Sequence, residues 1–378
     1  MTNRTIHFTK PFCTTELLAD ECAENVFKAK RMGRNWKEIK QKLNIGVKKE
    51  RSKLKLVLQK SNNKFPDEKA DILATILNSV LFATDQDLLD AIREFQNTPI
   101  MLIFVDAIGL AGTMTSYTVG KNAFTTEVPK FLERFLQALS QMTKIDIAII
   151  NDLKNWMKNT NDKHHAKHIA FTIANLYRRF CESTKSRKYA CENGKNEDVN
   201  EFTKFIIGRC EDSDCQINAL QIFENLPLLN LLPYANQFLC STNNNTMLVQ
   251  EEALRFLQLF DGKHFHWKTI NKLLRIFHNT CPLHQTITDQ TLAIDVLLNI
   301  LPNKELVGTY LLRSEELFPI EHEKWAYFYK NIARKRQTSP DFNLYWTKMR
   351  SFRVFRPNYA HRSLKATSDV SVINIAGK

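Results

Sequence analysis

One apolar spacing recurs along this chain and decides what it can fold into. In six segments, large apolar side chains occupy positions i, i+3, i+4 and i+7, which lie on one face of an α-helix. The segments are Leu73/Ile76/Leu77/Val80, Leu132/Phe135/Leu136/Leu139, Ile173/Leu176/Tyr177/Phe180, Ala253/Phe256/Leu257/Phe260, Ile270/Leu273/Leu274/Phe277 and Ala293/Val296/Leu297/Ile300. Each segment is therefore predicted to form an amphipathic helix with one face to bury.

Short connectors separate the predicted helices and carry the residues that end helices, as at Phe65-Pro66-Asp67, Asp261-Gly262, Cys281-Pro282 and Phe318-Pro319. Short links make neighbouring helices antiparallel, and hairpins that cannot bury their apolar faces alone must stack. Only 10 Gly and 11 Pro occur in 378 residues, too few for a turn-rich β protein. The sequence therefore predicts an all-α protein, an α-α superhelix in the form of an irregular solenoid or horseshoe.

The two ends of the chain depart from this pattern. Residues 1–65 are predicted to be a basic helical segment or linker, and residues 66–357 the superhelix. Residues 358–378 include a run of β-branched residues after Thr367, which predicts the start of a truncated β-sheet region. No window approaches the roughly 20 apolar residues of a membrane-spanning helix. The first twenty residues also lack the apolar core of a signal peptide.

Positive charge is concentrated in two stretches of this chain, whose formal net charge is +13. Thirteen Lys and Arg residues oppose two Glu between Lys28 and Lys60, and ten oppose one Asp between Lys330 and Lys365. We expect the first stretch to face an anionic partner, either phospholipid head groups or an acidic protein surface. The second is interleaved with aromatic residues, as in single-strand nucleic-acid binders, although terminal solenoid helices also use aromatic residues to fill their core.

The eight cysteines bear on the compartment of the protein. Six form three local pairs, Cys13/Cys22, Cys181/Cys191 and Cys210/Cys215, while Cys240 and Cys281 stand apart. Local pairs indicate an oxidising compartment. Scattered buried thiols in a reduced cytosolic protein are the equal alternative.

Catalytic and metal-binding patterns are weak. The sequence has no Gly-rich phosphate loop, no G-x-S-x-G and no H-E-x-x-H. His164 and His168 are spaced to share a metal, but a solvated polar face is the better interpretation beside Lys163 and Lys167. His278, Cys281 and His284 offer three ligands split by Pro282, with no fourth nearby. We expect neither an enzyme, nor a metal site, nor a bound cofactor.

The order of several segments resembles a known family. The segments are Phe104–Ile108 before Thr113, Tyr177–Cys181 before Cys191, Glu252–Leu254 through Asp261, Leu274–His278 before His284, and the helix to Ile300 followed by Leu301-Pro302-Asn303. From about Thr84 to the C-terminus, this order resembles the vitellogenin-type helical domain of the large lipid transfer proteins. The resemblance rests on pattern and order rather than on one invariant signature.

That resemblance implies a function. In the family a helical horseshoe adjoins sheets that hold lipid, so the chain would be the helical scaffold module of a lipid transporter that moves neutral lipid and phospholipid for lipoprotein assembly. The fragment itself would lack the lipid cavity. The implied partners are triglyceride, phospholipid, protein disulfide isomerase and an apolipoprotein B-like protein, with a membrane surface as a further candidate. The implied location is the lumen of the endoplasmic reticulum.

The resemblance also bears on the disulfides. It implies a bond between Cys181 and Cys191, although their spacing is wider than the family's tight pair. It does not imply one between Cys210 and Cys215, for which a local bridge and two free thiols both stay open. The alternative function is a cytosolic α-solenoid adaptor or nucleic-acid-associated protein, motivated by the regional positive charge.

Overall fold

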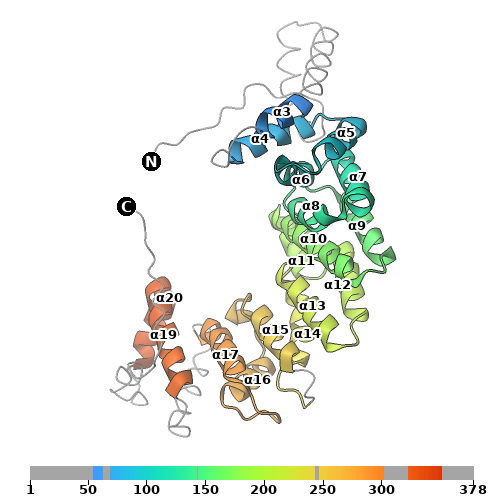
Figure 1. Ribbon diagram of the computed structural model, residues 1–378. Helices are drawn as coiled ribbons and strands as arrows, with labels where there is room; N and C mark the ends of the chain where they lie inside the picture. The colour runs from blue at the N-terminus through green and yellow to red at the C-terminus, as the bar shows by residue number, and fades with distance from the viewer. Residues whose placement is uncertain (1–53, 63–68, 143, 243–246, 302–321, 351–378) are drawn as a thin grey trace, which may run out of the picture. The chain divides into compact units, whose positions relative to one another are not determined.

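The computed structural model describes residues 54–62, 69–142, 144–242, 247–301 and 322–350. Throughout these ranges the regular structure is helical, without any strand (Figure 1). The prediction of an all-α fold is confirmed. The chain divides into two compact units, Met1–Phe180 and Cys181–Lys378.

The first unit is a stack of short helices (Figure 1). They are α3 (Leu54–Asn62), α4 (Lys69–Val80), α5 (Asp85–Phe95), α6 (Ile100–Ala111), α7 (Met114–Asn122), α8 (Leu132–Leu139), α9 (Ile147–Asn159) and most of α10 (Lys163–Glu182). Alternate helices pack on one another, with α6 between α4 and α8 and α5 against α7. This alternation is what stacked antiparallel hairpins produce.

The second unit repeats the same alternation. Its helices are α11 (Lys185–Glu192), α12 (Glu197–Gly208), α13 (Ser213–Glu224), α14 (Leu232–Gln237), α15 (Met247–Leu257), α16 (Trp267–Phe277), α17 (Ile287–Ile300), α19 (His322–Thr338) and α20 (Pro340–Arg350). Helices α13, α15, α17 and α19 pack in succession, and α16 packs against α17. Several of these helices are joined by short described connections, including the 3-10 turn Gly262–His264 between α15 and α16.

Five of the six segments with the recurrent apolar spacing lie wholly on helices, and the sixth lies on α15 except for its last residue. The burial of the predicted apolar face is clearest in α8 and α16. All four residues of each segment are buried: Leu132, Phe135, Leu136 and Leu139 in α8, and Ile270, Leu273, Leu274 and Phe277 in α16. The predicted connectors at Asp261-Gly262 and Cys281-Pro282 fall between helices. Phe260 lies just beyond the end of α15 but is also buried.

Local side-chain hydrogen bonds fix where several helices begin. Thr84 before α5, Thr113 before α7 and Thr286 before α17 each accept a hydrogen bond from the backbone N–H three residues on. In each case the side chain of that third residue accepts from the backbone N–H of the threonine, which completes a capping box. These caps satisfy backbone donors that the first helical turn leaves unpaired.

Several predictions fall outside the described residues. They include most of the basic stretch Lys28–Lys60, the pair Cys13/Cys22, the turns at Pro66 and Pro319, and the β-prone segment 358–378. The proposed division at residues 65 and 357 also lies there. Among the described helices, none is long and apolar enough to cross a membrane.

Candidate functional site

Three disulfides cross-link the second unit. Cys181 pairs with Cys191, Cys210 with Cys215, and Cys240 with Cys281, with Cα–Cα distances of 6.0, 5.0 and 5.2 Å. These distances lie in the usual range for disulfides. The first two are the local pairs considered from the sequence. The third is one that sequence reasoning missed, because its cysteines are 41 residues apart.

A buried polar network surrounds the Cys240–Cys281 disulfide. The backbone N–H of Cys240 donates to Gln250 Oε1 at 2.8 Å, and Gln250 Nε2 donates to Gln285 Oε1 at 2.6 Å. Both glutamine side chains are almost fully buried. Cys240 and Asn279 adopt positive φ, and the Asn279 Oδ1 accepts from the backbone N–H of Gln285 at 2.8 Å. The network therefore holds two left-handed backbone positions next to the disulfide.

Because Cys281 is bonded to Cys240, its sulfur is not available to the candidate metal group His278, Cys281 and His284. A sulfur bonded to Cys240 is not a thiolate and cannot serve as the zinc ligand that this group would need. His278 instead packs edge-on against Phe277, with ring centroids 4.7 Å apart. These residues therefore form part of the helix packing around the end of α16.

A buried lysine lies beside His278. Lys324 is 4% exposed, and its Nζ donates to the backbone oxygen of Phe277 at 2.9 Å. The same Nζ lies 4.8 Å from the centroid of the Phe277 ring. Burial lowers the pKa of Lys324 to about 8. Burial, with the Lys324 charge as a smaller cause, lowers the pKa of His278 to about 4.

We expect His278 to make the protein sensitive to acid. The unfolded chain binds a proton on this histidine near pH 6.5, whereas the folded chain does so only near pH 4, so the free energy of unfolding falls as the pH drops between these values. Urea midpoints measured from pH 7 to pH 4 should fall less steeply for His278→Gln than for the parent. The exposed His284→Gln serves as the matched control and should follow the parent. Superimposable curves for the parent and His278→Gln would contradict the assignment.

An apolar pocket of about 650 Å³ lies in the second unit. Leu229 lines it from the 3-10 turn Leu229–Leu231, Leu232 and Pro233 line it from the start of α14, and Leu257 lines it from the end of α15. Phe265 and Trp267 line it around the start of α16, together with His264, His266 and Lys268. Trp267 is 47% exposed. Asn236 and Thr269 also line the pocket, and no sequence pattern had indicated it.

The described aromatic residues of the C-terminal basic stretch, taken together with Phe328 just before it, are core residues. Phe328, Phe342, Tyr345 and Trp346 are between 1% and 7% exposed. The rings of Phe342 and Trp346 stack on each other with an interplanar angle of 6°. A buried ring offers no face to an unpaired base. These four residues therefore fill the core of α19 and α20, as terminal solenoid helices require.

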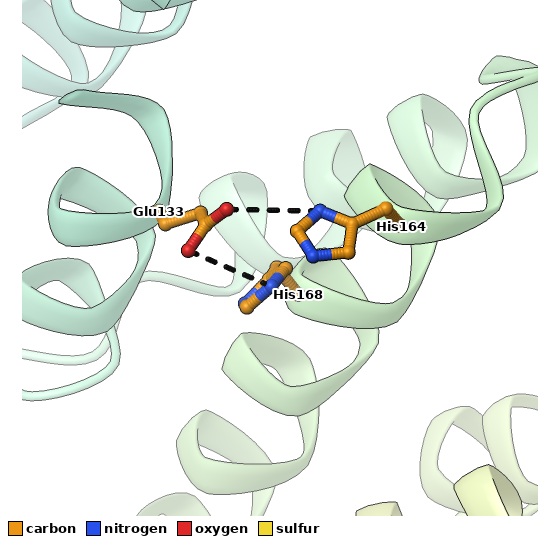
Figure 2. A group of neighbouring side chains, drawn as sticks. All are labelled: Glu133, His164 and His168. Carbon is orange, nitrogen blue, oxygen red and sulfur yellow. Dashed lines mark ion pairs between the residues drawn. The ribbon is translucent and has the colours of Figure 1, made fainter. Parts of the chain in front are cut away.

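The histidines of α10 gather with an acidic residue that the sequence had not placed near them. Figure 2 shows Glu133 from α8 facing His164 and His168. His164 Nδ1 lies 3.6 Å from Glu133 Oε1, and His168 Nε2 lies 3.9 Å from Glu133 Oε2. His165 turns instead to Asp162, with its Nδ1 3.1 Å from Asp162 Oδ2.

No family model matches the chain, but comparison with known proteins finds a clear relative. The chain is 30% identical over 385 aligned residues to a Caenorhabditis elegans protein named as a microsomal triglyceride transfer protein homolog. The alignment covers 100% of this chain and 42% of that relative. The predicted relationship to the lipid transfer proteins is confirmed, and the chain spans less than half the length of the relative.

Proposed function

We propose, from the relationship of this chain to a microsomal triglyceride transfer protein homolog, that it is the helical support of a lipid transfer protein. The cargo would be triglyceride and phospholipid for lipoprotein assembly. The lipid cavity would be formed by parts of the protein other than these helices. The observation that carries the proposal is the match along the entire chain.

The architecture of the two units agrees with a supporting role. Alternate helices stack in each unit, and capping boxes and disulfides fix the ends of several helices. Stacked hairpins of this kind present long surfaces to which other parts of a protein can attach. Such a role requires no catalytic group. The apolar pocket beside Trp267 would let the support also contact an acyl chain.

The proposed location is the lumen of the endoplasmic reticulum. The described part of the chain holds three disulfides, and stable disulfides are typical of oxidising compartments. The proposed protein partners are protein disulfide isomerase and an apolipoprotein B-like protein. A membrane surface would be met through the basic stretch Lys28–Lys60, most of which lies outside the described residues.

The alternative function is a cytosolic solenoid adaptor or nucleic-acid-associated protein. Two observations favour lipid transfer over this alternative. The described aromatic residues of the C-terminal basic stretch are buried rather than available for base stacking, and the described cysteines are joined in disulfides. A steeply salt-dependent affinity for RNA, together with reduced cysteines in the native protein, would favour the alternative.

Lipid transfer is testable by depleting the protein from cells of its source organism. Luminal extract of microsomes is mixed with donor vesicles that carry fluorescent triolein and with unlabelled acceptor vesicles. We expect the transfer rate to fall towards the spontaneous rate on depletion and to return when the native gene is restored. An unchanged rate after verified depletion would overturn the proposal.

A further inference from the structure

The group Glu133, His164 and His168 has the composition of a metal site. His164 and His168 lie four residues apart near the start of α10 and so share one helix face. Glu133 lies in the first turn of α8 and points towards both (Figure 2). Two imidazoles and one carboxylate form a ligand set that Zn²⁺ uses in sites with an open fourth position.

The distances also fit a metal ion better than a direct ion pair. The two histidine-to-carboxylate distances are 3.6 and 3.9 Å, longer than a charge-assisted hydrogen bond. A tetrahedral zinc ion holds neighbouring ligand atoms roughly 3.4 Å apart. In this group, one ligand atom from each residue lies within 4.8 Å of the other two. Small side-chain rotations would therefore bring all three onto one ion.

The framework around the group is fixed by packing. The apolar residues of α8 that flank Glu133 in the helix, Leu132 and Leu136, are 1% exposed. Thr172 of α10, one turn beyond His168, donates through its Oγ1 to the backbone oxygen of Leu136 at 3.1 Å. Asp162 accepts from the backbone N–H of His164 at 2.8 Å and so fixes the start of α10. Ligands held on two packed helices need little reorganisation on binding an ion.

From this geometry we infer that Glu133, His164 and His168 form a binding site for Zn²⁺ that joins α8 to α10. The side chains are 57%, 64% and 32% exposed, so water has access and would complete the coordination. An ion shared by two helices stabilises the folded first unit to the extent that it binds the folded state more tightly than the unfolded chain. The inference is independent of lipid transfer.

The test is zinc binding by the full chain, prepared without a histidine tag and first treated with a chelator. Titration calorimetry with Zn²⁺ alone measures affinity, and Co²⁺ substitution reports coordination through its visible absorption. We expect one strong site in the parent, and at least about tenfold weaker binding in His164→Ala, His168→Ala and Glu133→Gln. His165→Ala is the matched control on the same helix and should bind like the parent.

Two results would overturn the site. One is the lack of a strong zinc site in the parent chain. The other is an equal loss of affinity in His165→Ala, which would indicate diffuse binding to a histidine-rich helix. Glu133→Gln guards against a folding artefact, because this exposed side chain contributes no apolar packing, and circular dichroism confirms that each variant is folded.

Discussion

Replacing Cys240 and Cys281 together with serine is expected to lower the free energy of unfolding by about 4 kcal/mol. The disulfide closes a segment of 41 residues, and a long closed loop restricts the unfolded chain more than a short one. It also fixes the loop whose backbone donates to the buried Gln250. Urea denaturation of the parent and the double variant measures the loss.

The matched control is the double serine variant of Cys210 and Cys215. These cysteines are only 5 residues apart, so the same reasoning gives a loss of about 2 kcal/mol. We therefore expect the order of the two losses to follow loop length. A larger loss for the short loop would show that loop closure is not the dominant effect of the Cys240–Cys281 bond.

Replacing Gly109 with alanine is expected to destabilise the first unit by about 2 kcal/mol. Gly109 lies where α6 crosses α8, and an added Cβ would meet Ala138 Cβ at 2.6 Å, Leu139 N at 2.8 Å and Phe135 O at 2.9 Å. Two of these atoms belong to the backbone of α8, so relief requires the helices to move apart. Thermal or urea denaturation monitored by circular dichroism measures the change.

Gly208→Ala in α12 provides the comparison. An added Cβ at Gly208 would meet no atom within 4 Å. Alanine is favoured over glycine by roughly 0.5–1 kcal/mol in a helix interior, and the gain should be smaller at Gly208, the last residue of α12. Replacing glycine with alanine should therefore raise the free energy of unfolding at position 208 and lower it at position 109. If Gly109→Ala were neutral or stabilising, the close approach of α6 and α8 would not be a requirement of the fold.

The helices were the most predictable part of this protein. The spacing of apolar side chains every three or four residues follows from helix geometry alone. Segments such as Leu132–Leu139 and Ile270–Phe277 could therefore be predicted from the local sequence, without knowing which other helices pack against them. Helix ends were marked in the same local way by Gly262 and Pro282. Local rules therefore predicted the elements and the class of fold.

The candidate sites were less predictable because they join distant segments. Cys240 and Cys281 lie in the connections that precede α15 and α17, two helices that pack on each other in the fold. Glu133 reaches His164 and His168 only because α8 lies against α10. Helical spacing alone placed the two histidines on one helix face, which was interpreted as a solvated polar face rather than a metal site. The pocket beside Trp267 likewise takes its walls from residues 229 to 269. None of these contacts leaves a periodic signal in the sequence.

The central claim is that this stack of helices supports lipid transfer. Its most direct test is the rate of triolein transfer in luminal extract from depleted cells that express either the Gly208→Ala or the Gly109→Ala protein at equal levels. The assay is run at a temperature where the first unit of Gly109→Ala is largely unfolded and that of the parent is folded. We predict full transfer with Gly208→Ala and loss of transfer with Gly109→Ala. If both variants transferred triolein at the same rate although the first unit of Gly109→Ala was unfolded, lipid transfer would not depend on these helices.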